Sequence, residues 1–302
     1  MKKLVINCFY FCVGLVFLLL AKIKNKVAGY TPKTFSMDEL ERCISYDINI
    51  VEDWLKHLKE YAPAYSIADR HILELGPGSD LGVGLFLLSK SAKKYTAVDI
   101  YDLASKVSPA FYDAFFTRLQ EEKAAPALIA ELREELRKTQ QHDNGKLNYV
   151  CRSDFNFVDS IGDDRVDVIF SNAAFEHFSD FQHTIRDLSK VVAPGSVLII
   201  SIDLRTHSRW IRDKDPNNIY RYPNWLYKLF RFQSSPNRVR PYQYQYALEQ
   251  NGWRDVCIQP EMRLDDKRLV YFQDYLNKRF KDACNQMDYL TIWICAVKGV
   301  DI

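Results

Sequence analysis

Hydrophobic and polar residues alternate along this chain with two different periods, which separate predicted strands from predicted helices. Apolar runs of strand length occur at seven places, 71–75, 94–100, 147–151, 167–170, 196–202, 253–259 and 290–297. Between most of them, apolar residues recur every three or four positions, which is the spacing of the buried face of a helix. Strands that alternate with helices predict an α/β fold in which helices cover both faces of a mostly parallel sheet.

The end of the first predicted strand has the features of a ligand-binding turn. Gly76 and Gly78 follow the strand 71–75 directly, and glycine lets the backbone turn sharply and approach a ligand closely. Asp99 ends the second predicted strand, 23 positions beyond Gly76. A carboxylate at that place can accept hydrogen bonds from both hydroxyls of a ribose. These residues together predict a site for a nucleoside-containing cofactor.

Two further residues distinguish between kinds of cofactor. The Gly-x-Gly-x-x-Gly fingerprint of dinucleotide binding requires glycine where this chain has Leu81. Glu74, directly before the turn, would repel a diphosphate, whereas it would complement the ammonium group of an amino acid. The sequence therefore favours a cofactor with an amino acid tail, and an NAD(P)-dependent oxidoreductase is the alternative.

Polar segments that follow the later strands complete a recognisable order of landmarks. Ser153-Asp-Phe155 follows the third predicted strand, Ser171-Asn-Ala-Ala-Phe-Glu-His177 follows the fourth, and Pro194-Gly195 precedes the fifth. With Glu74-x-Gly-x-Gly78 and Asp99, this order resembles the class I S-adenosylmethionine-dependent methyltransferases, in the branch with Ser-Asn-x-x-x-Glu-His after the fourth strand. The resemblance covers about residues 67–300 and departs from the family motif at Asp80, where a third glycine is usual.

The resemblance implies a fold and a cofactor. The implied fold is a seven-stranded, mostly parallel, doubly wound sheet with an antiparallel last strand, to which this chain adds an N-terminal hydrophobic helix and two insertions. The implied cofactor is S-adenosyl-L-methionine, with Glu74 and the glycines at its amino acid, Asp99 at the ribose and Asp154 at the adenine. For Asp154, a helix N-cap is the alternative role. The predicted cofactor-binding residues are Glu74, Gly76, Gly78, Asp99, Ile100, Asp154, Phe155 and Asn172.

Three residues are predicted to act on the acceptor. His177 ends the segment after the fourth strand, and Asp203 and His207 follow the fifth strand at the same edge of the sheet. Histidine is suited to accept a proton because its unperturbed pKa is about 6.5. The alternatives are a packing role for His177 and a solvated loop for the other two. Asp203 has no acidic neighbour at metal-ligand spacing, so no metal site is predicted.

The N-terminal segment has the composition of a membrane helix. Residues 4–21 contain Asn7 as their only strongly polar member, and lysines flank them on both sides. At about 1.5 Å per residue such a helix nearly crosses a hydrocarbon core of about 30 Å. No small-x-small cleavage site ends it. We therefore predict an uncleaved anchor or interfacial helix, with a signal peptide and a buried helix as alternatives.

These patterns divide the chain into three parts. Residues 1–30 form the anchor and its basic flank, 31–66 a helical cover, and 67–302 the methyltransferase domain, with insertions at about 101–146 and 205–240. The lysines that follow the anchor favour the downstream side as cytoplasmic. We therefore expect a membrane-associated protein with a single N-terminal anchor and a cytoplasmic catalytic domain.

Composition restricts the compartment and the partners. The seven cysteines are an odd number without Cys-x-x-Cys spacing, which favours a reduced compartment and no zinc site.

The insertion 205–240 is basic and aromatic. It holds nine Arg or Lys residues against Asp213 and Asp215, interleaved with aromatic residues. This composition suits an anionic membrane, a phosphate-bearing or sugar substrate, or single-stranded nucleic acid, and a lid with solvated charges is the alternative. The anchor favours the first two, and with a net charge of only +2 no nucleic-acid partner is expected.

The expected reaction is in-line transfer of a methyl group to an oxygen of a small-molecule, glycan or lipid-linked acceptor. Positioning supplies most of the acceleration, since a methyl sulfonium is already reactive. An inactive scaffold that binds the cofactor at a membrane is the remaining alternative.

Overall fold

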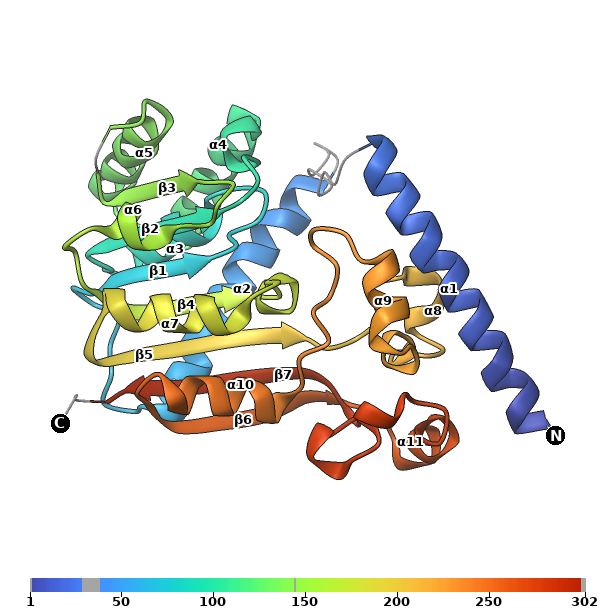
Figure 1. Cartoon of the computed structure of the whole chain (residues 1–302). Helices are drawn as coiled ribbons and strands as arrows, with labels where there is room; N and C mark the ends of the chain where they lie inside the picture. The colour runs from blue at the N-terminus through green and yellow to red at the C-terminus, as the bar shows by residue number, and fades with distance from the viewer. Residues whose placement is uncertain (1, 29–38, 144, 300–302) are drawn as a thin grey trace.

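One sheet of seven strands organises the computed structural model, which describes residues 2–28, 39–143 and 145–299 (Figure 1). The strands are β1 (His71–Leu75), β2 (Lys94–Asp99), β3 (Leu147–Cys151), β4 (Val166–Asn172), β5 (Val192–Asp203), β6 (Trp253–Arg263) and β7 (Tyr289–Lys298). Their order is β3-β2-β1-β4-β5-β7-β6. Neighbours from β3 to β5 pair in parallel, whereas β7 is antiparallel to both β5 and β6. The predicted sheet, with its antiparallel last strand, is confirmed.

Helices cover both faces of this sheet. They are α1 (Lys2–Ala28), α2 (Leu40–Tyr61), α3 (Gly82–Ser89), α4 (Pro109–Glu121), α5 (Pro126–Gln140), α6 (Phe157–Ile161), α7 (Phe181–Val191), α8 (Arg209–Arg212), α9 (Asn224–Phe230), α10 (Pro241–Gln250) and α11 (Asp266–Gln273). Alternate strand residues face opposite sides, so Ile72 packs with α2 to α5 in one core and Leu73 packs with α6, α7 and α10 in the other. The sheet is therefore doubly wound.

Two local sequence patterns differ from the structure or lie outside it. Ser36-Met-Asp-Glu39 has the pattern of a capping box, but it begins outside the described residues. Residues 264–284 have the pattern of a single helix, but the structure has α11 followed by two short 3₁₀ turns. Asn277 and Asp282 each accept a hydrogen bond from the backbone N–H two residues on, and such local bonds start new turns where a helix would otherwise continue.

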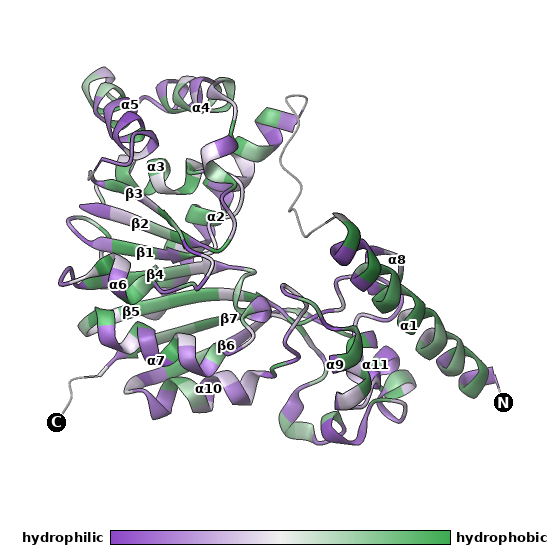
Figure 2. Cartoon of the chain, turned by 45° about the horizontal axis from the view of Figure 1, so that its top comes forward, coloured by the Kyte–Doolittle hydropathy of each residue, from purple (hydrophilic) through white to green (hydrophobic). Residues whose placement is uncertain are grey.

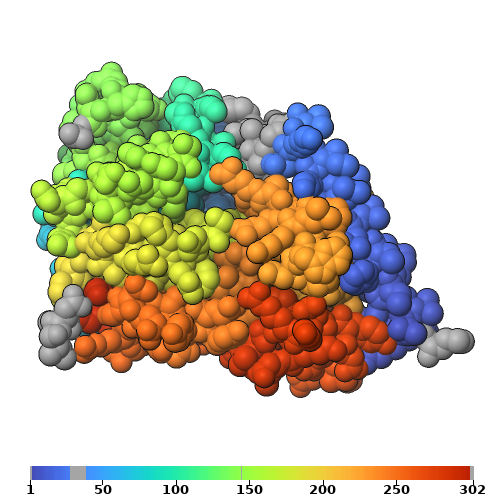
Figure 3. All heavy atoms as spheres, viewed as in Figure 1, coloured from blue at the N-terminus to red at the C-terminus, as the bar shows by residue number. Residues whose placement is uncertain are grey.

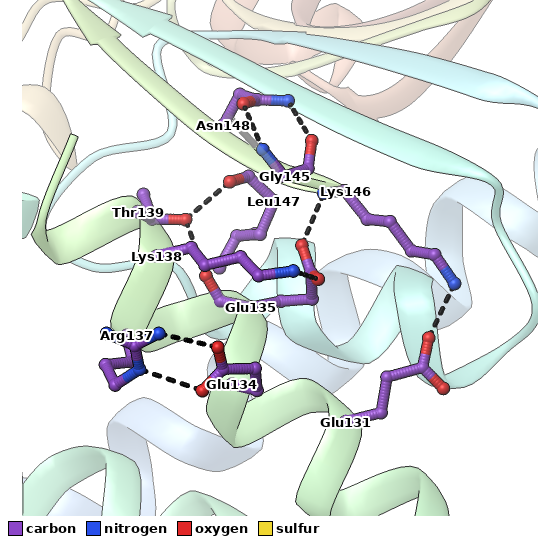
Figure 4. Close-up of polar contacts among 10 residues, drawn as sticks. All are labelled: Glu131, Glu134, Glu135, Arg137, Lys138, Thr139, Gly145, Lys146, Leu147 and Asn148. Atoms are coloured by element: carbon purple, nitrogen blue, oxygen red, sulfur yellow. Dashed lines mark hydrogen bonds and ion pairs between the residues drawn. The ribbon is translucent and has the colours of Figure 1, made fainter. Parts of the chain in front are cut away.

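The first insertion supplies α4 and α5, and α5 fixes the start of β3. The Glu135 side chain, which is buried, accepts hydrogen bonds from Lys138 Nζ, at 2.8 Å, and from the backbone N–H of Lys146. Lys146 Nζ also contacts Glu131 at 2.5 Å (Figure 4). The charged side chains of α5 are therefore not all exposed to solvent, because Glu135 is buried.

The second insertion forms a third, smaller core with α1. Tyr220, Tyr222 and Tyr227 are buried there, and apolar residues of α1 pack against them. The Tyr222 hydroxyl donates a hydrogen bond to the Phe11 carbonyl at 3.0 Å, and Asn218 Nδ2 donates to the Tyr10 carbonyl at 2.9 Å. In Figure 1, α1 lies beside α8 and α9, away from the sheet. One face of α1 is thus attached to the domain.

Gly14 is a point of close approach in this attachment. A Cβ atom added there would overlap both Asn218 Oδ1 and the Tyr222 hydroxyl. We expect Gly14→Val to lower the free energy of unfolding by about 1–3 kcal/mol, because the extra methyl groups force the two elements apart. Denaturant unfolding of the full chain in detergent measures this. Cys12→Val, on the exposed side of the same helix, is the control and should change stability by no more than about 0.5 kcal/mol; equal effects would contradict the docking.

Candidate functional site

A cavity of about 1350 Å³ opens at the carboxyl ends of β1 to β4. Open α/β sheets bind ligands at this edge, and the volume exceeds the 300–1,000 Å³ or so that is typical of one small-molecule site. In Figure 3 the surface is hollowed where the green, yellow and orange segments meet. All the predicted cofactor-binding residues line it, namely Glu74, Gly76, Gly78, Asp99, Ile100, Asp154, Phe155 and Asn172. The cavity has room for a cofactor and an acceptor together.

The turn after β1 requires its glycines. Gly76 and Gly78 have φ values of +78° and +80°, which side chains other than glycine rarely adopt. A Cβ at Gly76 would lie 2.7 Å from the Ala174 Cβ, whereas a Cβ at Gly78 would meet nothing within 4 Å. Gly76 therefore serves close packing within the protein, and Gly78 leaves open space at the cavity wall.

Asp99 is held rigidly at the end of β2. Its Oδ1 accepts a hydrogen bond from the Tyr101 backbone N–H at 2.9 Å. Burial raises the pKa of Asp99, while backbone N–H groups of Tyr101, Ile100 and Gly78 act in the opposite direction. The carboxylate is thus fixed by the main chain beside the glycine turn, with the rest of its hydrogen-bonding capacity available to a ligand.

Three buried carboxyl groups gather beside the turn. Glu74, Asp80 and Asp47 of α2 are each less than 5% exposed, and within the described residues none forms an ion pair with Lys or Arg. Burial raises the pKa of Glu74 to about 8, although the Tyr95 hydroxyl donates a hydrogen bond to it. Burial also raises the pKa of both Asp47 and Asp80, and the negative charge of Asp80 raises that of Asp47 further. Such a cluster is complementary to a cation.

The part of the cavity at which adenine is expected to bind is more open to solvent than the carboxyl cluster. Asp154 lines the cavity, but its carboxylate also pairs with Arg152 at 2.8 Å, and that interaction lowers its pKa. Phe155 packs its ring 4.9 Å from that of Phe178. Asn172, at the end of β4, donates a hydrogen bond from Nδ2 to the Tyr46 hydroxyl at 3.1 Å.

The three predicted catalytic residues lie together, but only one reaches the cavity. The rings of His177 and His207 are stacked with centroids 4.9 Å apart, and only His177 of the three lines the cavity. Asp203 binds Arg205 through both carboxylate oxygens, at 2.8 Å each, and its Oδ2 lies 4.0 Å from His207 Nε2. Burial lowers the pKa of His177 and that of His207, the latter to about 4.

Several cavity residues were not anticipated from the sequence. Tyr46 and Asp47 come from α2, which was expected as a structural cover, with a substrate gate as the alternative. A signal was present, because Asp47 is a carboxylate in the apolar stripe of that helix, between Ile44 and Ile48, both buried. From the second insertion, Lys228 and Arg231 also line the cavity. The basic composition of this insertion suited a phosphate-bearing or sugar substrate, but it could not indicate which of its residues reach the cavity.

The basic residues of the second insertion are divided between its interior and the cavity. Arg221 forms a buried ion pair with Asp215, at 2.6 Å. Arg238 and Arg240 are buried, lie over aromatic rings and donate hydrogen bonds to backbone carbonyls. The alternative of a lid with solvated charges is therefore wrong for these three arginines, because the aromatic residues form a core that encloses the guanidinium groups.

The fold and this edge of the sheet define an α/β protein that binds a nucleoside cofactor. A family model described as a methyltransferase domain matches residues 46–258, and the chain belongs to that family. The protein is an S-adenosylmethionine-dependent methyltransferase, and the alternative of an oxidoreductase is not supported.

Solved structures resemble the chain in fold. An S-adenosylmethionine-dependent methyltransferase from Archaeoglobus fulgidus is 17% identical, with a TM-score of 0.43, over 84% of this chain and 98% of that one. One from Mesorhizobium loti is 12% identical, with a TM-score of 0.42, over 82% and 99%. Phosphoethanolamine N-methyltransferase 2 from Haemonchus contortus, in complex with S-adenosyl-L-methionine, is 13% identical, with a TM-score of 0.43, over 89% and 62%. A search among curated proteins found no match.

Asp47 provides a test of the carboxyl cluster. Folding raises the pKa of Asp47. The contribution of Asp47 to the free energy of unfolding is therefore fully present at pH values below its pKa in the unfolded chain, and it is lost as the pH rises towards its pKa in the folded chain. Asparagine does not ionise, so Asp47→Asn should gain stability relative to the native chain by about 1 kcal/mol or more between about pH 5 and about pH 8. Unfolding curves at both pH values measure this. Asp53→Asn, exposed on the same helix, should show no such gain, and a pH-independent difference for Asp47→Asn would refute the buried cluster.

Proposed function

We propose that the protein transfers the methyl group of S-adenosylmethionine to an oxygen atom of an acceptor carried at a membrane surface. The observation that supports the cofactor's orientation is the cluster of Asp47, Glu74 and Asp80, three buried carboxyl groups at one end of the cavity that form no ion pair with a Lys or Arg of the described residues. The ammonium group of the cofactor complements it. Asp99 then binds the ribose hydroxyls, and Asp154 and Phe155 border the adenine.

The acceptor occupies the remaining part of the cavity, between β4 and the second insertion. His177 lies there, beside residues of that insertion such as Arg231 and Ser234. In the reaction an oxygen lone pair of the acceptor forms the new C–O bond while the C–S bond breaks, and its electron pair stays on sulfur to give S-adenosylhomocysteine. Of the predicted catalytic residues, His177 is the one placed to receive the acceptor's proton, with Asp203 and His207 behind it. Holding the two reactants in line supplies most of the rate enhancement.

The N-terminal helix supports a membrane location. Within the described residues, α1 is the one helix long and apolar enough to cross a membrane, over Lys2–Val27. Figure 2 shows it as almost continuously hydrophobic. Large apolar side chains on its free side and on the neighbouring insertion are exposed, namely Leu4, Val5, Phe9, Val16, Leu19, Leu20, Ile23, Val27, Trp210, Trp225 and Leu229.

The attachment of α1 supports a position along the membrane surface over one that crosses the membrane. Its contacts with the domain run from Lys3, which pairs with Asp274 at 3.1 Å, to Lys22, which donates a hydrogen bond to the Leu229 carbonyl at 2.5 Å. A crossing α1 would bring Asp274 and its polar neighbours into the hydrocarbon, which is costly. A helix with one face on the protein and one on lipid avoids that cost and accounts for the exposed Trp and Leu residues. The catalytic domain would then lie in the cytoplasm, on the same side as both ends of α1.

This arrangement favours a lipid-linked acceptor, including a glycan on a lipid carrier. Helix α9 has Trp225 and Leu229 exposed next to α1, while its Lys228 lines the cavity. An acceptor held in the membrane therefore meets the cavity at α9, and Lys228 and Arg231 suit an anionic group on it.

Cofactor binding tests the assignment of the cavity. We expect Asp99→Ala to weaken S-adenosylmethionine binding by about 100-fold or more, because two hydrogen bonds to an ionised group are lost. Calorimetry on the full chain measures this, and the exposed neighbour substitution Asp102→Ala should leave affinity unchanged. Release of S-adenosylhomocysteine with lipid-linked hydroxyl acceptors tests the reaction. Equal affinity in the two variants would remove the ribose assignment, and binding without turnover on any such acceptor would favour an inactive scaffold.

Membrane binding is tested with vesicles. Trp225→Ser should reduce association with phosphatidylserine-containing vesicles by about tenfold, since a large apolar side chain is lost from the lipid face. Tyr246→Ser, exposed on α10, is the matched control. In inverted membrane vesicles, an N-terminal tag should be digested together with the domain by external protease. A protected tag would show that α1 crosses the membrane.

A further inference from the structure

Behind the cavity wall, the structure brings together three metal-ligating side chains from two separate segments. Glu176 and His177 belong to the 3₁₀ turn after β4, and His207 belongs to the segment after β5. One potential ligand atom of each lies within 4.8 Å of the other two. The sequence gives no metal-binding spacing here, because 30 residues separate His177 from His207.

The polar atoms of this cluster lack partners although they are buried. Glu176 is only 2% exposed, and neither of its carboxylate oxygens has a partner at hydrogen-bond geometry within the described residues. Nδ1 of His177 and Nδ1 of His207 are also buried without a partner. The backbone groups of Glu176 and Asp203 lie near this carboxylate but do not meet hydrogen-bond geometry. A buried carboxylate without a well-placed partner is costly, and in native proteins such a group normally marks an ion, a water molecule or a functional role.

We propose that Glu176, His177 and His207 bind one divalent transition-metal ion, of the Zn²⁺ or Mn²⁺ kind, at the acceptor side of the cavity. Two imidazoles and one carboxylate are the ligands of catalytic zinc sites that keep a position open for water or substrate, and imidazole nitrogen selects against Mg²⁺ and Ca²⁺. Ligands bind Zn²⁺ at about 2.0–2.2 Å, so side-chain movements of about an ångström bring the three atoms onto one ion.

The surroundings of both histidines fit this assignment. Metal-bound histidines usually donate their second ring N–H to a carboxylate or a backbone carbonyl. Within the described residues the nitrogens without a hydrogen-bond partner are the Nδ1 atoms, while Nε2 of His207 lies 4.0 Å from Asp203 Oδ2, and the backbone of Ser234 lies near the His177 ring. Arg205 neutralises much of the Asp203 charge. Arg212 also lies near His207, and its positive charge would repel a metal ion bound there. This repulsion is smaller for an ion that also binds an anionic oxygen.

This inference rests on the proposed function for its role in the reaction. His177 borders the cavity, so the ion would stand beside the acceptor. There it would bind the acceptor hydroxyl and lower its pKa, and the proton would pass to solvent water, with the two imidazoles acting as ligands and His177 no longer needed as the base.

Metal uptake by the full chain in detergent tests the site. After EDTA treatment and with excess reductant, the native chain should bind one Zn²⁺ per chain in calorimetry. Glu176→Gln and His207→Gln should each weaken binding by at least about 100-fold, since one of three ligands is lost. His183→Gln, on α7 with its ring 3.0 Å from Asp187 and exposed, should bind as the native chain does. Co²⁺ in place of Zn²⁺ should give a spectrum without a thiolate charge-transfer band.

The outcomes separate this proposal from the proposed function. Absence of saturable uptake, or uptake that both substitutions leave unchanged, would overturn the metal site and indicate a buried polar cluster or binding at the cysteines. S-adenosylmethionine binding is measured on the same samples and should persist in Glu176→Gln, which also reports that the variant is folded. Zinc binding without S-adenosylmethionine binding would refute the cofactor assignment and leave the metal site in place.

Discussion

The mutual repulsion of buried carboxylates at the end of β1 constrains the whole site. Burial raises the pKa of Asp47, Glu74 and Asp80 alike and so opposes their simultaneous ionisation, and Tyr95 donates a hydrogen bond to Glu74. A ligand cation would relieve this repulsion. The cluster therefore lowers the stability of the free protein at high pH and, under the proposed function, would select a cofactor with an ammonium group.

This constraint also explains why α2 belongs to the site. The Trp54 ring of α2 stacks on Phe170 of β4, with centroids 4.6 Å apart and planes 3° from parallel, which holds the helix across the sheet. Asp47 then presses against the backbone of Gly82, where any Cβ would overlap its carboxylate. The family match begins at residue 46, within this helix. A segment that looks like a cover in the sequence thus supplies one wall of the cavity.

Features that follow from local sequence patterns could be predicted, whereas features that depend on contacts between distant segments could not. The sheet, its antiparallel last strand and the cavity residues near Gly76 and Asp99 could be predicted, because strand periodicity and the meeting of parallel strand ends are regular. The role of Asp47 could have been inferred only from a charge in an apolar stripe. The junction of Glu176 with His207 could not be predicted, because it depends on how the segment after β5 folds back against the turn after β4. The assignment of each cavity residue to a part of the cofactor remains a prediction.

The second insertion shows why composition alone misleads about basic segments. Its arginines and aromatic residues suggested an outward patch, yet Arg221, Arg238 and Arg240 are buried among the rings and backbone carbonyls that hold α1 in place. A guanidinium group can satisfy its five donors inside such a core, and its planar face packs on aromatic rings.

The core of the second insertion connects α1 to the cavity wall. It packs against α1 on one side and positions α9 and the segment with Ser234 on the other. The hydroxyls of Ser234 and Tyr101 lie 3.0 Å apart, which joins the two insertions across the cavity mouth. Under the proposed function, insertion of the apolar face of α1 into lipid would therefore also shift the cavity wall at which the acceptor enters.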